Sequence, residues 1–212
     1  ESLGTPTGLL RVTAPADIGD HLLAGIMARM RRHHPAVRID MVLMDRYVDL
    51  VADGIDAAIR TGALRDSTLI AKNVGLARWV PFASPDYLES APPLDAPQAL
   101  RHHCCLQFTP LGKDAWTLTD GRGSVVVPMS GQVMVNDVRV IRSMALAGEG
   151  VALLPTYLCR DEWTQGELVR VMPEWHAKAD PVHLVYPHQH FIPPKLRAFV
   201  DLAARELATW LE

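Results

Sequence analysis

The chain has 212 residues, of which 49% are hydrophobic and 21% are charged, as is typical of a folded globular protein and not of a disordered one. Its formal net charge of −3 excludes a global basic field that would hold nucleic acid. No apolar run approaches the roughly 20 residues that span a bilayer, so we expect no membrane partner. The three cysteines, two of them adjacent, make no disulfide framework and predict a reducing, cytoplasmic compartment.

The first residues, ESLGTPTG, contain no initiator methionine and neither the basic nor the apolar region of a signal peptide. Their composition is typical of a linker. We therefore expect an excised fragment or a processed chain.

The next residues alternate between strand and helix patterns. LLRVTA (9–14) predicts a strand, and the apolar spacing after it predicts a helix that Asp17 caps and Pro35 ends. VRIDMVLM (37–44) predicts a second strand.

A second strand–helix–strand unit follows directly. RYVDLVAD (46–53) predicts a short helix ended by Gly54, and DAAIRT (56–61) predicts a third strand. This β-α-β-α-β order predicts a parallel sheet with right-handed crossovers.

The third strand ends on a cation, Arg60, followed by Thr61. Ligands of parallel sheets bind beyond the carboxyl ends of the strands, so both residues are expected at a crevice. A buried guanidinium is costly unless it is paired. The sequence leaves two partners equally open: a small molecule, or a neighbouring carboxylate such as Asp45 or Asp66.

The rest of the chain indicates a second α/β unit. The patterns predict extended runs at 69–85 and 181–187, a hairpin around Asp120-Gly121, a helix after VMVND that Gly148 ends, a buried strand VALLP (151–155), and a last helix from Pro193-Pro194. We expect residues 1–79 with 188–212 to form one subdomain and residues 80–187 to form a second, inserted one.

A set of motifs is specific in combination, although no single one would be. The longest is DRYVDLVADGIDAAIRTGALRDSTLIA (45–71), and GLLRVTAP, ASPDYL, VND, GEGVALLP, GELVRVMPEW and PPKLRAFVDL accompany it. Together they cover nearly the whole chain and resemble the effector-binding domain of LysR-type transcriptional regulators. The resemblance implies an α/β fold of two Rossmann-like subdomains joined by crossover strands, type 2 periplasmic-binding-protein-like, with a ligand cleft between them.

The resemblance also implies which residues face the ligand. They are Ala16 and Asp17 at the start of the first helix, Arg46, Arg60 and Thr61 at strand ends, Asn136 and Asp137 at the start of the inserted helix, and Pro155, with Gln107 nearby. Helix N termini favour an anion, such as a small polar or aromatic acid, but the Asp17 carboxylate would compete with it. Asp17 and Asp137 are more simply explained as helix caps.

The sequence contains little that indicates a metal site or a catalytic site. HHCC (102–105) has zinc-compatible atoms, but successive strand side chains alternate faces, so a buried pair of core cysteines is the simpler explanation. HQH (188–190) has the same weakness. No nucleophile-elbow motif and no glycine-rich phosphate loop is present. We expect no catalytic residues, no metal and no cofactor, and therefore no enzyme.

The favoured function is the effector-sensing domain of a DNA-binding transcription factor. The resemblance implies a small-molecule effector, DNA contact through an N-terminal winged helix-turn-helix of the full-length chain, and a homodimer or homotetramer. Pairing of helix 17–34 with a strand edge of the inserted unit, through the face that carries Ala24, Ala28, Arg31 and Arg32, suits a two-fold assembly. An ordinary solvated face explains the same residues equally well. A solute-binding protein of a transport system and an enzyme on the same scaffold stay as alternatives, since fold alone does not choose between them.

Overall fold

A computed structural model describes residues 4–64 and 68–212 of the chain. The chain divides into two compact units, unit 1 (residues up to Ala77 and Asp180–Glu212) and unit 2 (Arg78–Ala179), and each is described by itself below. Two long strands, β4 (Leu69–Ala83) and β11 (Ala179–Pro187), pass from one unit to the other. The division differs from the expected one mainly at residues 180–187, because Val182–Val185 of β11 pair with β3 of unit 1.

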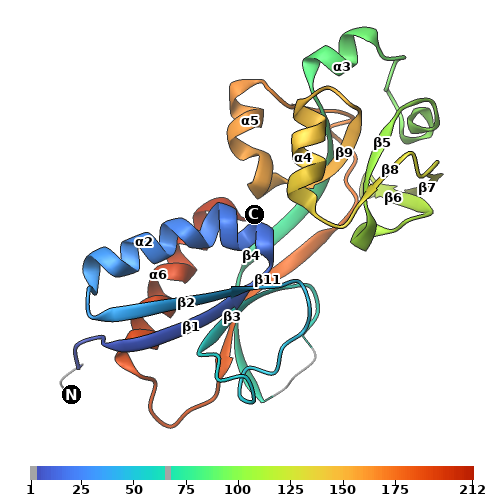
Figure 1. The fold of residues 1–212 in the computed structure, drawn as a ribbon. Helices are drawn as coiled ribbons and strands as arrows, with labels where there is room; N and C mark the ends of the chain where they lie inside the picture. Colours follow the sequence, from blue (N-terminus) through green and yellow to red (C-terminus); the bar gives the residue numbers. More distant parts are fainter. Residues whose placement is uncertain (1–3, 65–67) are drawn as a thin grey trace. The chain divides into compact units, whose positions relative to one another are not determined.

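Unit 1 is built on a mostly parallel sheet (Figure 1). Its other elements are β1 (Gly8–Ala14), α1 (Ala16–Ile18), η1 (Gly19–Leu23), α2 (Ala24–His33), β2 (Val37–Leu43), β3 (Ala57–Thr61) and α6 (Pro194–Trp210). The strand order is β2-β1-β3-β11, in which β1 is parallel to both β2 and β3 and β11 is antiparallel to β3. The three predicted strands and their parallel arrangement are confirmed.

The predicted helix 17–34 is present, but it consists of α1, a π-helical turn η1 and α2. Asp17 does not cap it: Pro15 occupies the N-cap position and Asp17 lies in the first turn. A proline whose φ is pre-set near the helical value starts a helix without a capping side chain. Gly19 allows this helix to approach β2, because a Cβ atom there would overlap the Leu43 side chain.

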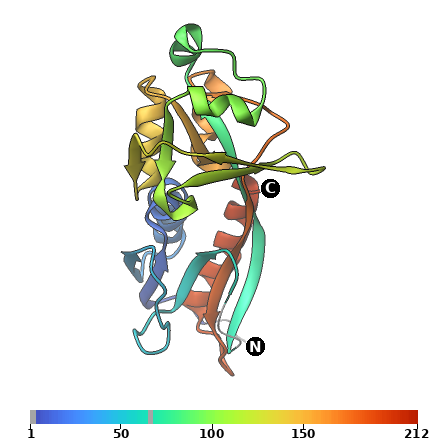
Figure 2. The same ribbon diagram turned by 90° about the vertical axis from the view of Figure 1, so that its right-hand side faces the viewer.

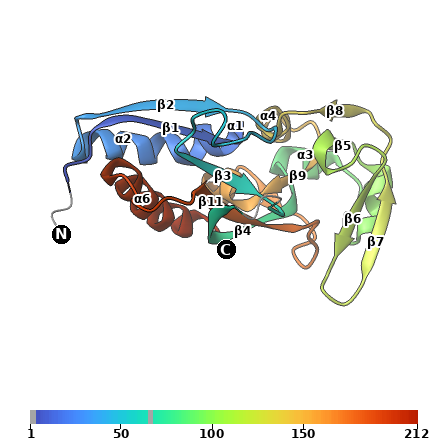
Figure 3. The same ribbon diagram turned by 90° about the horizontal axis from the view of Figure 1, so that it is seen from below.

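Helices α2 and α6 run side by side and contact each other (Figures 1 and 3). Each contributes an apolar stripe to the core of unit 1. The buried residues are Ile26, Met27 and Met30 of α2 and Leu196, Phe199, Val200, Leu202, Ala203 and Leu207 of α6. These residues recur at three- and four-residue intervals, so one face of each helix is removed from water.

The short helix predicted at 46–53 is wrong: the segment is irregular up to residue 49 and forms turns over residues 50–54. The carboxylate of Asp49 accepts hydrogen bonds from the backbone N–H groups of Val51 and Ala52, at 3.0 Å each. An aspartate that bonds the backbone two and three residues ahead offers the chain an alternative to the helical pattern. The apolar residues of the segment, Val48 and Leu50, are nevertheless buried.

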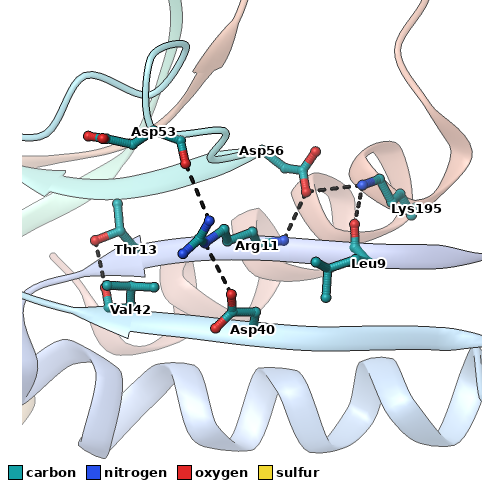
Figure 4. A network of polar contacts seen from close by, with 8 residues as sticks. All are labelled: Leu9, Arg11, Thr13, Asp40, Val42, Asp53, Asp56 and Lys195. Atoms are coloured by element: carbon teal, nitrogen blue, oxygen red, sulfur yellow. Dashed lines mark hydrogen bonds and ion pairs between the residues drawn. The ribbon is translucent and has the colours of Figure 1, made fainter.

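A polar network fastens these turns and the start of α6 to the sheet (Figure 4). Strand pairing between β1 and β3 covers only two residues of each strand, and the Asp56 carboxylate replaces a strand partner by accepting a hydrogen bond from the Arg11 N–H at 2.8 Å. The same carboxylate oxygen lies 3.0 Å from Lys195 Nζ. The Arg11 side chain reaches Asp40 on β2 and the carbonyl of Asp53. The network therefore holds the turn before β3 in register with β1.

In unit 2 the strand order is β4-β9-β5-β8, with β10 paired to β4. Its other elements are α3 (Pro85–Ser90), η2 (Pro97–His102), β5 (Cys105–Phe108), η3 (Thr109–Leu111), β6 (Ala115–Thr119), β7 (Ser124–Pro128), β8 (Val133–Val135), α4 (Val138–Leu146), β9 (Val151–Pro155), η4 (Thr156–Cys159), α5 (Arg160–Gln165) and β10 (Val169–Arg170). The sequence predicted the β6–β7 hairpin, helix α4 and strand β9, and it missed the short helices α3 and α5.

The β6–β7 hairpin forms a separate two-stranded antiparallel sheet. Figure 2 shows it extending away from the other strands of unit 2. Its inward side chains belong to the core of the unit, where Trp116, Leu118 and Val127 pack with Leu100 and Leu153. The hairpin is therefore anchored to the core of unit 2 by these buried side chains.

Candidate functional site

A cavity of about 360 Å³ lies within unit 1, and we call it the Arg60 cavity. It is lined by Pro15, Met44, Asp45, Arg46, Tyr47, Val48, Leu50, Arg60, Thr61, Ala63, Leu64, Leu69 and Val185. Its volume falls in the range of about 300–1,000 Å³ that is usual for small-molecule sites.

The cavity lies where three parallel strands end. β1 ends at Ala14, which is in register with Leu43 at the end of β2, and the N–H of Met44 donates to the carbonyl of Ala14 at 2.9 Å. Arg60 and Thr61 end β3 on the other side of β1. Parallel strands point their carboxyl ends to one edge of the sheet, which is where α/β folds bind ligands.

One wall of the cavity is apolar and continuous with a small core. Val48, Leu50 and Val185 belong to a buried cluster against which Met44 and Leu69 pack. All five side chains also line the cavity. A ligand would therefore place an apolar part of its surface against this wall.

Arg60 lines this cavity, and the hydrogen bonding of its side chain is incomplete. Its guanidinium is half-buried, and Nη2 has no hydrogen-bond partner among the residues that the structure describes. Burial lowers the pKa of Arg60 from its ordinary value, while the nearby Tyr47 acts in the opposite direction. The guanidinium carbon lies 6.0 Å from the centre of the Tyr47 ring, within reach of a weak cation–π contact. An incompletely paired, half-buried cation favours an anionic partner.

Asp45 and Asp66 were the two carboxylates considered as partners of Arg60. Asp66 lies outside the described residues. Asp45 lines the same cavity, but its Oδ1 accepts a hydrogen bond from the backbone N–H of Ala16, at 3.3 Å, and no ion pair joins it to Arg60 in the described part of the chain. One of the helix N-terminal amides expected to face an anionic ligand, that of Ala16, is therefore bonded to Asp45.

The structure brings three of the predicted site residues together, Arg46, Arg60 and Thr61. Arg46 and Thr61 are exposed at the cavity, so their polar groups are open to a ligand. Ala16 and Asp17 do not line it. Tyr47, Leu64, Leu69 and Val185 also line the cavity and were not predicted to do so. Tyr47 follows directly on the predicted Arg46, which was the one local signal for it.

The other predicted residues, Asn136, Asp137 and Pro155, belong to unit 2. Asp137 caps α4, as its simpler interpretation predicted: its Oδ1 accepts a hydrogen bond from the Arg139 N–H at 2.9 Å. Its carboxylate also pairs with the Arg139 guanidinium at 2.6 Å, and this hydrogen bonding lowers the pKa of Asp137 below its usual range. Asn136 is exposed.

Two further residues of unit 2 have structural partners. Pro155 ends β9 and is paired with Trp79 of β4. Gln107 is fully buried, and its side-chain amide uses both ends internally, donating to the Lys113 carbonyl at 2.6 Å and accepting from the Gly131 N–H at 2.9 Å. Gln107 therefore holds two loops together.

The histidine and cysteine clusters do not assemble a metal site. No group of three or more potential metal ligands gathers within the ranges 4–64 and 68–212. His103 and Cys105 are buried, and burial raises the pKa of the Cys105 thiol to about 12. A thiol with such a pKa is protonated at neutral pH and is a poor ligand or nucleophile.

Comparison with known proteins assigns this arrangement to a family. Residues 3–208 match the model of the LysR substrate binding domain, so the chain belongs to this family. Its α/β sheets match solved regulatory domains of LysR-type transcriptional regulators, which have the type 2 periplasmic-binding-protein-like fold. The fold that the sequence predicted is confirmed.

Individual relatives agree with this assignment. The chain is 33% identical over 199 residues to the HTH-type transcriptional regulator PtxR of Pseudomonas aeruginosa, covering 93% of the chain and 64% of PtxR. It is 30% identical over 204 residues to CrgA of Neisseria meningitidis, covering 95% of the chain and 68% of CrgA. The chain thus spans about two thirds of the length of these curated relatives.

Solved structures give the same answer. The regulatory domain of AphB from Vibrio vulnificus aligns with a TM-score of 0.84 at 26% identity, covering 95% of this chain and all of that domain (100%). The structure of the LysR-type regulator CrgA aligns with a TM-score of 0.84 at 29% identity, covering 96% of this chain and 69% of CrgA. Over the described residues, no helix is long and apolar enough to cross a membrane.

Proposed function

We propose that the chain is the effector-sensing domain of a LysR-type transcription factor and that a small organic acid binds in the Arg60 cavity. Membership of the LysR substrate binding domain family and the regulatory relatives support the class of function. The single observation that carries the ligand assignment is Arg60, whose buried Nη2 has no partner among the described residues and which lines a cavity of about 360 Å³.

The cavity chemistry favours a monoanion with an apolar body. A carboxylate on Arg60 Nη2 would form a charge-assisted hydrogen bond, the stronger kind, and Arg46 would add positive potential. The Thr61 hydroxyl offers a further donor, and the wall of Val48, Leu50 and Val185 accepts the apolar part. The Asp45 carboxylate at the same cavity opposes a second negative charge on the ligand.

The proposal extends to the full-length protein. An effector bound here would change DNA binding through an N-terminal helix-turn-helix domain and through a homodimer or homotetramer. Such coupling requires that the ligand bind two conformations of the protein with different affinities. Ala24, Ala28, Arg31 and Arg32 of α2 are all exposed and supply the two-fold contact that we propose. Light scattering of the purified domain should give the mass of a dimer, and a strictly monomeric mass with and without effector would remove this contact.

The class of function is tested by a ligand screen followed by a DNA-binding assay. Sodium salts of small carboxylic acids, from acetate to benzoate and its hydroxylated derivatives, are first screened by thermal shift on the purified chain. A ligand that binds only the native state raises the melting temperature with its concentration. In the full-length protein that ligand should change the affinity for promoter DNA, and its concentration should stay constant during prolonged incubation. Steady consumption of the ligand would contradict the proposal and favour an enzyme.

A further inference from the structure

Unit 2 contains a second cavity, away from the residues predicted to face a ligand. It has a volume of about 250 Å³ and is lined by Leu100, Arg101, His103, Cys105, Pro128, Met129 and Ser130. We call it the His103 cavity. His103 and Cys105 lie at the amino end of β5, whereas sheets of this kind bind their usual ligands at the carboxyl ends. None of the predicted ligand residues lines it.

The hydrogen bonds around Tyr87 favour one tautomer of His103. The Tyr87 hydroxyl oxygen accepts a hydrogen bond from the backbone N–H of Cys104 at 3.2 Å and lies 2.9 Å from His103 Nδ1. Burial raises the pKa of Tyr87, which keeps the hydroxyl protonated. We assign this proton to Nδ1, which places the imidazole proton of His103 on Nε2.

His103 Nε2 is consequently a donor in need of an acceptor. The residue is only 7% exposed, and Nε2 has no hydrogen-bond partner in the described part of the chain. A buried donor left without an acceptor costs free energy, so a group that supplies an acceptor to this atom would bind favourably.

The remaining lining residues indicate what that group is. Arg101 is exposed at the cavity and uses Nε on the Gln98 carbonyl at 3.1 Å, and Ser130 adds a hydroxyl. No acidic side chain lines the cavity, while Leu100, Pro128 and Met129 make it partly apolar. A donor, a cation and an apolar wall together fit a small carboxylate with a short hydrocarbon part.

We propose that the His103 cavity is a second ligand site, in which a small monocarboxylate accepts a hydrogen bond from His103 Nε2 and pairs with Arg101. The site is non-covalent. The raised pKa of Cys105, whose Sγ already donates to the Leu100 carbonyl, leaves no nucleophile in the cavity. A single ordered water on Nε2 is the competing occupant, and the experiment distinguishes the two.

The test uses the methyl resonance of Met129, which lines the cavity, in protein labelled at the methionine methyl groups. Sodium acetate, propionate and benzoate are titrated against sodium chloride at matched ionic strength, and the exposed Met134 of β8 is the internal reference. The proposal expects a saturable shift of the Met129 resonance with at least one carboxylate, with a dissociation constant of about 10 mM or tighter.

Two substitutions separate binding from folding. His103→Asn keeps an acceptor near the position of Nδ1 for Tyr87 but removes the Nε2 donor, and it should abolish the saturable shift. His103→Gln, which places an amide near the position of Nε2, should restore part of it. Arg101→Gln should weaken binding about tenfold, whereas the control Arg122→Gln in the β6–β7 turn should leave it unchanged.

Two results would overturn the proposal. One is a Met129 resonance that shows no saturable shift with any of the three carboxylates, which leaves water as the occupant. The other is a saturable shift that is unchanged in both His103→Asn and Arg101→Gln. Such a ligand would contact neither the proposed donor nor the proposed cation, and would therefore bind elsewhere.

Discussion

Arg60 and Asp137 are both charged residues of the predicted ligand site, but they differ in their hydrogen-bond partners within the protein. Asp137 has a backbone N–H and a guanidinium as partners, both from Arg139. Arg60 ends a buried strand and keeps one buried nitrogen without a partner among the described residues. The motifs of the family resemblance include both residues, but of the two only Arg60 has a buried polar atom without a hydrogen-bond partner among the described residues. The comparison indicates that a charge is available to a ligand when the fold has not already satisfied it.

The largest expected effect is on ligand affinity at Arg60. Arg60→Met should weaken binding of the carboxylate found by thermal shift by about 1.5–3 kcal/mol, the usual contribution of a hydrogen bond to a charged group. The free energy of unfolding should not fall, because the substitution removes a half-buried, incompletely paired cation. Calorimetry and denaturant unfolding measure the two quantities. Arg38→Met, at an exposed position of β2, is the matched control and should change neither.

For Asp137 we expect the main effect on the free energy of unfolding and not on ligand affinity. Asp137→Ala removes the N-cap of α4 and should lower the free energy of unfolding by about 0.5–2 kcal/mol. Asp161→Ala, at an exposed and non-capping position in the first turn of α5, is the control and should have little effect. A stability of Asp137→Ala equal to that of the wild type would show that the cap is dispensable and would remove the contrast with Arg60.

The charge of Asp137 should also be visible in the pH dependence of stability. Because its pKa is lowered in the folded state, its contribution is present above the unfolded pKa of about 3.9 and is lost as the pH falls through the folded value. Asp137→Asn keeps a capping side chain but removes the charge. The difference in unfolding free energy between wild type and Asp137→Asn should therefore be constant at neutral pH and shrink in acid. A difference that grows in acid contradicts this assignment.

The smallest expected effect concerns Tyr47. Its ring lies 6.0 Å from the Arg60 guanidinium carbon at an exposed position, where a cation–π contact is worth about 0.5–1 kcal/mol. Tyr47→Leu should therefore weaken carboxylate binding by no more than this amount, measured by the same calorimetry. A larger loss would indicate direct contact between the Tyr47 ring and the ligand.

The strands and three of the polar residues that line the Arg60 cavity could be predicted from the sequence. The apolar runs 9–14, 37–44 and 56–61 have the length of buried strands, and their carboxyl ends lead directly to Arg46, Arg60 and Thr61. Two local predictions were wrong because a neighbouring residue opposed the expected helix pattern. Pro15, and not Asp17, occupies the N-cap position of the first helix. In 46–53 the Asp49 carboxylate accepts a hydrogen bond from the Val51 N–H, and this bond replaces the helical pattern.

The apolar wall could not be predicted, because it depends on pairing between distant segments. Val185 reaches the cavity since β11 pairs with β3 in a register that sets Val185 opposite Ala58. Leu69 comes from the start of β4. Neither register is encoded in a local pattern. The hydrogen bond between Asp45 and the Ala16 N–H could not be predicted either, since only the folded sheet brings these two residues together.

We propose that Arg60 holds the carboxylate of the effector. Arginine-selective nitrogen NMR of the guanidinium groups, recorded while the thermal-shift ligand is titrated, tests this contact. We expect the Nη resonances of Arg60 to shift with the same saturation curve as the melting temperature, while those of Arg38 stay constant. An Arg60 signal that does not move when the ligand saturates the protein would show that Arg60 does not hold the carboxylate.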